Sequence, residues 1–110
     1  MISVVLARNR GGRLCGFTVT DHSQSEVCAA VSMLVLNTVN SIEALTDEPS
    51  LYDYNEEGGF IQFELPQVKI GKIGNNSHDA NLLMESMALG LRSVKEMYGN
   101  EIEIKEDVYD

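Results

Sequence analysis

The 110-residue sequence has no tryptophan, two prolines and two cysteines, and it is poor in positive charge. Two cysteines do not make the dense framework of a small secreted disulfide scaffold, so we expect reduced thiols and a cytoplasmic protein. No apolar run approaches the roughly 18 residues of a membrane span, and no signal-peptide core follows Met1. The sequence therefore predicts no membrane partner.

Eight Lys and Arg residues oppose seventeen Asp and Glu residues, which gives a formal net charge of −9. This balance argues against a surface that grips nucleic-acid phosphates and suits a basic partner, although solubility alone explains most acidic small proteins. Hydrophobic residues make up 44% and charged residues 23%, an ordinary globular composition. Length and composition predict a single domain over 1–110.

The hydrophobic pattern alternates between strand and helix periods along the chain. Alternating or β-rich runs predict strands, and glycine pairs at 11–12 and 58–59 mark turns between them. Apolar residues at helical spacing predict two long helices. The expected strands are 2–7, 13–20, 51–54, 60–65 and 101–106, and a connecting stretch without a helix is expected over 66–75. The order ββαββαβ is typical of an α+β fold in which a mainly antiparallel sheet packs against two long helices.

The first predicted helix is apolar around much of its circumference, so it should be central in the fold. Its beginning has two candidate caps, because Ser23 with Glu26 forms a possible capping box and Ser25 is a possible N-cap. Its end should fall near Pro49, which cannot continue a helix. The second helix has Asn76 as a candidate cap and Gly99 as its end. Gly90 in its middle predicts a packed helix contact, either within the chain or within a dimer.

The stretch that could carry chemistry joins the second strand to the first helix. Cys28 lies in the first turns of that helix, where the positive end of the helix dipole favours a thiolate. His22 lies where the strand ends and could exchange a proton with that thiol. A helix that starts near Ser25 favours this pairing, because a start at Ser23 separates the two residues by about 9 Å of helical rise. The alternative is a core cysteine beside a solvated turn histidine.

The block His22-x5-Cys28-Ala29-Ala30-Val31-Ser32 resembles the signature of the ribosomal-processing cysteine protease family (Prp). The similarity continues through 37–45, the glycine turn at 58–59 and the end of the second helix at 98–100.

This resemblance implies a homodimeric cysteine peptidase without a cofactor, with His22 and Cys28 at the catalytic dyad positions. The family substrate is the N-terminal extension of large-subunit ribosomal protein twenty-seven, and no direct nucleic-acid contact is implied. Ser32 matches a family serine, for which an orienting or helix-stabilising role is as reasonable as a chemical one.

The chain departs from the family pattern around the histidine. Asp21 replaces a glycine, Ser23 replaces an alanine, and the loop before Cys28 is short. Asp21 could orient His22, or it could cap the strand end. A non-catalytic dimeric module that binds a ribosomal protein or an assembly factor is therefore the competing hypothesis.

Other chemically suggestive residues receive structural interpretations. The alternation over 13–20 places Cys15 with Phe17 and Val19 on the apolar face, as core packing, although a disulfide with Cys28 stays open. His78 has no partner at metal-ligand spacing, so we expect a surface histidine and no metal. The stretch 71–74 has the Gly-x-x-Gly spacing of a KH-domain loop, but four residues are a weak signal and we expect a plain loop.

Overall fold

The computed structural model describes residues 1–20, 26–55 and 59–109. Its five-stranded sheet has the order β3-β4-β2-β1-β5. Neighbouring strands are antiparallel except for β1 and β5, which are parallel. The strands are β1 (Ile2–Arg8), β2 (Leu14–Thr20), β3 (Leu51–Asn55), β4 (Phe60–Glu64) and β5 (Ile102–Val108). The helices are α1 (Glu26–Leu45), α2 (Pro66–Lys69), α3 (Asn75–Tyr98) and the 3-10 turn η1 (Gly99–Glu101).

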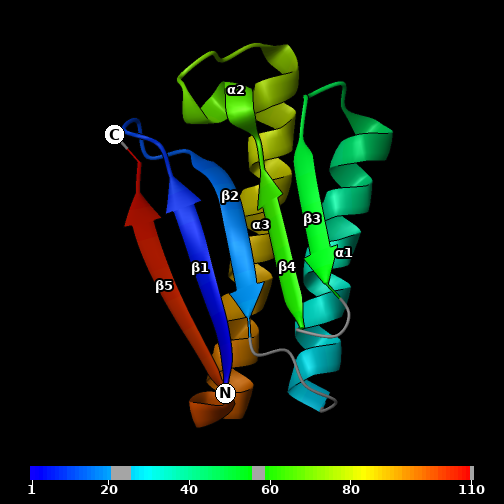
Figure 1. Ribbon diagram of the computed structural model, residues 1–110, viewed down its shortest axis with the longest axis vertical. Helices are drawn as coiled ribbons and strands as arrows, with labels where there is room; N and C mark the ends of the chain where they lie inside the picture. The colour runs from blue at the N-terminus through cyan, green and yellow to red at the C-terminus, as the bar shows by residue number, and fades with distance from the viewer. Residues whose placement is uncertain (21–25, 56–58, 110) are drawn as a thin grey trace.

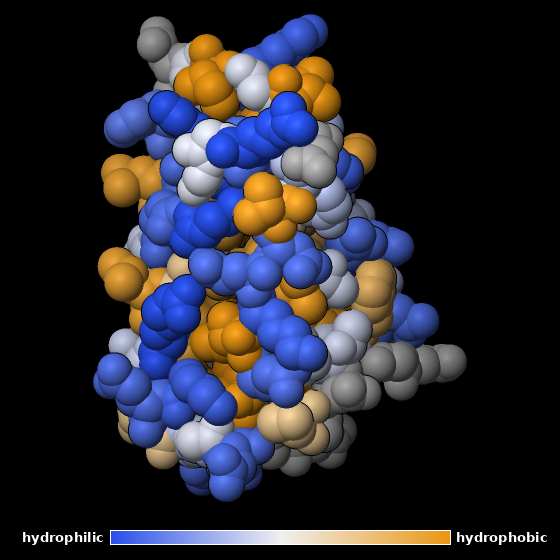
Figure 2. Space-filling view, turned by 90° about the vertical axis from the view of Figure 1, so that its left-hand side faces the viewer, coloured by the Kyte–Doolittle hydropathy of each residue, from blue (hydrophilic) through white to orange (hydrophobic). Residues whose placement is uncertain are grey.

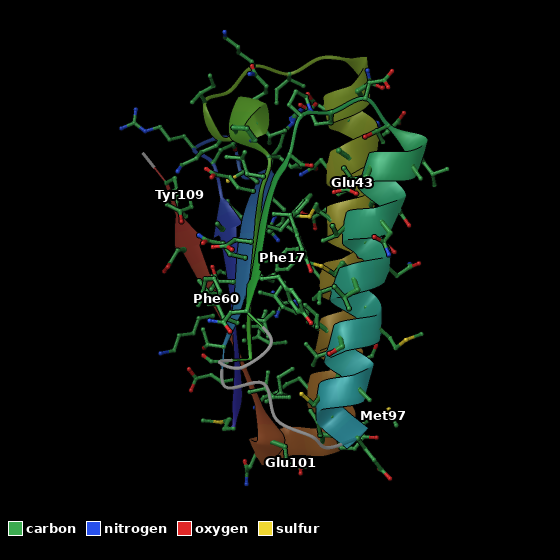
Figure 3. All side chains as sticks on the ribbon, turned by 45° about the vertical axis from the view of Figure 1, so that its right-hand side comes forward. Phe17, Glu43, Phe60, Met97, Glu101 and Tyr109 are labelled. Atoms are coloured by element: carbon green, nitrogen blue, oxygen red, sulfur yellow. The ribbon has the colours of Figure 1, made fainter. Side chains whose placement is uncertain are left out.

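Both long helices cover the same face of the sheet, and the other face carries no helix among the described residues (Figure 1). Figure 3 shows the side chain of Phe17 between the sheet and the helices, whereas Tyr109 lies on the opposite side. The predicted α+β class, the ββαββαβ order and the mainly antiparallel sheet are confirmed. The two predicted long helices correspond to α1 and α3.

Two local predictions were wrong. The stretch after β4 contains the short helix α2, because Pro66 occupies its first turn with a preset φ and Val68 is fully buried. The N-cap of α3 is Gly74 rather than Asn76. The N–H of Gly74 donates to Ser77 Oγ at 3.2 Å, and the Ser77 hydroxyl donates to the buried carboxylate of Glu48. These polar contacts join the segment that follows α1 to the start of α3.

Cys15 departs from strict strand alternation. Ala7 pairs with Gly16 and Arg8 pairs with Leu14, so Cys15 is the extra residue of a β-bulge. Phe17 and Val19 keep the predicted alternation and face the helices.

The helix α1 shows why composition alone is a poor guide to a membrane span. By length and composition it passes the criterion for a membrane-spanning helix, with a mean hydropathy of 1.4, contrary to our expectation that no run comes close. Its inner side nevertheless belongs to the core formed with the sheet and α3. The buried residues on that side are Val27, Cys28, Val31, Val35, Thr38, Val39 and Ile42. A core helix of a soluble fold satisfies the same criterion, so α1 needs no bilayer to explain it.

The predicted helix contact at Gly90 is confirmed, and it lies within the chain. A Cβ atom at Gly90 would lie 2.7 Å from Leu34 Cδ2 of α1. This close approach explains a glycine in the middle of α3, where it costs about 1 kcal/mol relative to alanine.

We expect Gly90→Leu to lower the free energy of unfolding by about 1–3 kcal/mol, because its side chain must displace Leu34 from a packed contact. Gly90→Ala should change stability little, because the gain in helix propensity offsets a shift of the flexible Leu34 side chain. Urea denaturation measures both, with Ser86→Leu at an exposed position of α3 as the matched control. Equal stability of Gly90→Leu and the wild type would contradict the contact.

Candidate active site

The candidate nucleophile lies at the beginning of α1. The strand β2 ends at Thr20, the described chain resumes at Glu26, and Cys28 is the third residue of the described helix. The N–H groups of a first helical turn have no intrahelical acceptors and lie at the positive end of the helix dipole. A thiolate at Cys28 would be stabilised there, as would a developing oxyanion next to it.

The side chain of Cys28 is buried, with 2% of its surface exposed. Its neighbours Val27 and Val31 are equally buried. A catalytic thiol is expected to be accessible, so the burial of Cys28 favours the alternative of a core cysteine. The physical reason is its position on the inner half of α1, next to the residues that pack on the sheet.

Ser32 lies one helical turn after Cys28 on the same side of α1 and is half-buried. The structure therefore brings together two of the four predicted site residues. The other two, His22 and Asp21, lie outside the described residues, as do the candidate caps Ser23 and Ser25. The proton exchange between His22 and Cys28, and the choice between the two caps, stay predictions.

The second cysteine is a core residue, as predicted. Cys15 is fully buried, and its Sγ lies 3.5 Å from the carbonyl oxygen of Ala7. Burial raises the pKa of this thiol, partly offset by the nearby ammonium group of Lys69. Neither cysteine forms a disulfide, which excludes the bond between Cys15 and Cys28 that the sequence left open. In Figure 1, β2 begins at the opposite end of the sheet from the first turn of α1.

The other chemically suggestive features lie away from Cys28. His78 is exposed, 3.6 Å from the Asp79 carboxylate, as a surface histidine should be. The stretch 71–74 is an exposed loop. Among the described residues no cluster of three or more His, Cys, Asp or Glu side chains could hold a metal. A hollow of about 380 Å³ lies between the β1–β2 turn, α2 and Tyr109, at the end of the sheet remote from Cys28.

Comparison with known proteins assigns the chain to a class of enzymes. Residues 1–103 match the sequence model of a family described as cysteine protease Prp. The chain therefore belongs to a class of cysteine proteases. More particularly, the chain belongs to the Prp family, as the resemblance of the sequence implied.

Curated relatives cover nearly the whole chain. The ribosomal processing cysteine protease Prp of Bacillus subtilis is 26% identical over 114 residues, which span 98% of this chain and 99% of that protein. The protein of the same name from Staphylococcus aureus is 26% identical over 110 residues, spanning 94% and 97%.

Solved structures share the fold. Prp from Staphylococcus aureus with a covalently linked product peptide is 25% identical, with a TM-score of 0.83 and coverage of 97% of this chain and all of that one. A protein from Streptococcus mutans is 30% identical, with a TM-score of 0.82 and coverage of 99% and 96%.

The residues that continue the Cys28 side of α1 were not predicted from the sequence. Leu36 follows Ser32 by four residues, and Val39 and Glu43 follow at helical spacing. The sequence does contain a signal for these residues, because they form a second line of positions at helical spacing beside the apolar stripe. It was overlooked because the row mixes buried, half-buried and exposed residues.

The two cysteines should differ in reactivity. In the folded protein near pH 6.5 we expect iodoacetamide to modify Cys28 at least about tenfold faster than Cys15. Thiolates are the reactive form, the positive end of the α1 dipole favours a thiolate at Cys28, and burial raises the pKa of Cys15 with no such compensation from a helix. Peptide mass spectrometry reads the modified position. Cys15→Ala should keep the fast adduct and Cys28→Ala should lose it. Preferential modification of Cys15 would count against a nucleophile at Cys28.

Proposed function

We propose that this protein is a cysteine endopeptidase that uses Cys28 and His22 as a catalytic dyad. The observation that carries the proposal is membership of the Prp cysteine protease family over residues 1–103, in a chain whose Cys28 lies at the start of α1. The favourable end of the helix dipole supports the choice of Cys28 over Cys15.

In the first step His22 accepts the thiol proton, and the Sγ of Cys28 attacks the carbonyl carbon of the scissile peptide bond. Backbone N–H groups at the start of α1 donate hydrogen bonds to the oxyanion that forms. The tetrahedral intermediate then collapses, the carbon–nitrogen bond breaks, and His22 passes its proton to the leaving amine. The product of this step is a thioester between Cys28 and the N-terminal part of the substrate.

In the second step water attacks the thioester while His22 accepts a proton from that water. The carbon–sulfur bond breaks, the carboxylic acid is released, and the proton returns to the Cys28 sulfur. Asp21 has two compatible roles, as an orienting carboxylate for His22 or as a cap of the strand end. Ser32 lies one helical turn after Cys28 on the same side of α1. Its role is either to orient another residue of the site or to stabilise the helix.

The proposed substrate is the N-terminal extension of large-subunit ribosomal protein twenty-seven. The ribosomal processing function of the named relatives supports a substrate of this class, and the net charge of −9 suits a basic protein segment. We extend the proposal to one domain over 1–110 that works as a homodimer in the cytoplasm, without a cofactor or direct contact with nucleic acid. The lack of a disulfide at Cys15 and Cys28 is compatible with a reducing compartment.

The burial of Cys28 favours a second candidate function. A thiol with 2% of its surface exposed is typical of core packing, so the same fold could serve as a non-catalytic dimeric module that binds a ribosomal protein or an assembly factor. The peptidase requires in addition that Cys28 become accessible when a peptide arrives. The two functions differ in whether a bound peptide is cut.

We expect a single cut in a synthetic peptide that spans the extension and the first mature residues of the host's own ribosomal protein twenty-seven. Cys28→Ala and His22→Ala should each lower kcat/KM by about a thousandfold or more, because each removes a group that forms or breaks a bond. Mass spectrometry measures the cut, and Cys15→Ala, which removes the other thiol, is the control that should keep it. Binding without cleavage by the wild type would overturn the peptidase and favour the binding module.

A further inference from the structure

The two edges of the sheet differ in how they are protected. The edge strand β5 carries charged side chains at Glu103, Lys105, Glu106 and Asp107. Arg8 and Arg92 form ion pairs with Glu106, and Lys105 pairs with Glu103 at 3.1 Å. Figure 2 views the molecule from this side and shows hydrophilic residues over most of it. Charges of this kind block the addition of another strand.

The opposite edge strand, β3, has the composition of a strand that accepts a partner. Its sequence is Leu-Tyr-Asp-Tyr-Asn, with one charged residue, and all five residues are exposed. The rings of Tyr52 and Tyr54 stack with their centroids 6.3 Å apart. Tyr52 is opposite Phe63 in the ladder, so the two rings lie on the helix-covered side of the edge.

The backbone of β3 is oriented for strand addition at Tyr52. The N–H of Tyr54 donates to the Asp53 side chain at 2.9 Å, so it is directed away from β4. In an antiparallel pair the N–H groups of alternate residues share a direction. The N–H and C=O groups of Tyr52 therefore point outward from the edge as well.

The side of α1 that faces the β3 edge also carries the candidate nucleophile, Cys28. Leu34 of α1 packs against α3, so the opposite flank of α1, on which Glu43 lies, faces the β3 edge. In agreement with this placement, burial raises the pKa of Tyr52 and the Glu43 carboxylate raises it further. Residues at intervals of three or four share one side of a helix. Toward the beginning of α1 this side continues through Val39, Leu36, Ser32 and Cys28. In Figure 1 α1 extends beyond β3, so a strand added to β3 would lie over this row.

The surroundings of β3 favour a peptide of alternating character. On the helix-free side, a hollow of about 220 Å³ is lined by Leu51, Tyr52, Asp53, Gln62 and Glu64. Its apolar wall and two carboxylates suit the stem and the positive head of a lysine or arginine. On the other side the tyrosine rings and Leu36 suit apolar or aromatic side chains.

We propose that β3 binds an extended peptide by strand addition, in the groove that β3 forms with the Cys28–Ser32–Leu36–Glu43 row of α1. The inference rests on the proposed function, because it names the substrate-binding strand of the same site. The peptide alternates apolar residues toward Tyr52 and α1 with basic residues toward Asp53. Cys28 and Glu43 are separated by about 22 Å of helical rise, which an extended chain covers in about seven residues. Recognition therefore extends about seven residues to one side of the cut.

Binding tests this inference independently of cleavage. A fluorescein-labelled form of the peptide spanning the extension of ribosomal protein twenty-seven is titrated with protein that carries Cys28→Ala. Adding Tyr52→Pro should weaken binding at least about tenfold more than adding Tyr52→Ala, because only proline removes the outward N–H. Val108→Pro, at an exposed position of the other edge strand, is the matched control and should bind as before. Circular dichroism and a thermal melt verify that each variant is folded.

A second measurement leaves the protein unchanged. Single N-methyl groups are placed along the peptide backbone, each removing one N–H. Strand addition predicts that methylation weakens binding at every second residue, because alternate N–H groups face β3. This pattern keeps the test decisive even if Tyr52→Pro fails to fold.

The possible outcomes separate the inference from the proposed function. Equal binding by the Tyr52→Pro and Tyr52→Ala proteins, N-methyl effects without a period of two, or no binding of this peptide would each overturn strand addition at β3. A peptide that binds with the predicted pattern but is not cut by the wild type would support strand addition and overturn only the peptidase. A peptide that is cut normally but shows no N-methyl effect with a period of two would support the peptidase and overturn strand addition at β3.

Discussion

The contact between the two long helices is the constraint on which the candidate site depends. Gly90 allows α3 to approach Leu34 of α1 closely, and the inner side of α1 packs on the sheet at the same time. These two contacts leave α1 no freedom to rotate about its axis. Because residues at helical spacing keep fixed relative directions, the rotation that places Leu34 against α3 also turns Cys28 and Ser32 toward the β3 side. A contact more than a helical turn away thus determines the direction of the candidate nucleophile.

The same geometry explains why one edge of the sheet is protected and the other is not. β5 lies beside the parallel strand β1, and its ion pairs with Arg8 and Arg92 occupy an edge that has no part in the proposed chemistry. β3 lies on the side of α1, where protection by charge would also exclude an extended substrate. An exposed, tyrosine-rich edge is an aggregation hazard in a small protein. Its retention beside the row that leads to Cys28 is reasonable if a peptide binds there.

Periodicity predicted most of the fold, and its failures have local physical causes. The strands and long helices follow from apolar patterns of period two and about 3.6. Such patterns contain no information about individual hydrogen bonds. Gly74 caps α3 in place of Asn76 because the buried Glu48 holds Ser77, a contact across 29 positions that no local rule contains. Cys15 leaves the alternation because of a bulge. For the candidate site, sequence reasoning placed Cys28 and Ser32 on α1 correctly, whereas the direction of α1 required the three-dimensional contact with α3.

The burial of Cys28 and the exposure of β3 have a common consequence for the proposed mechanism. A thiol that is 2% exposed cannot reach a carbonyl carbon until the residues that cover it move. Moving them costs free energy, and a substrate strand bound along β3 can offset that cost through backbone hydrogen bonds made several residues from the cut. Substrates that lack this remote segment should then lose kcat as well as affinity, because the same interactions that bind the peptide also open the site. Under this mechanism a buried cysteine and a specific peptidase are compatible, since a peptide long enough to bind β3 favours the state in which the thiol is accessible.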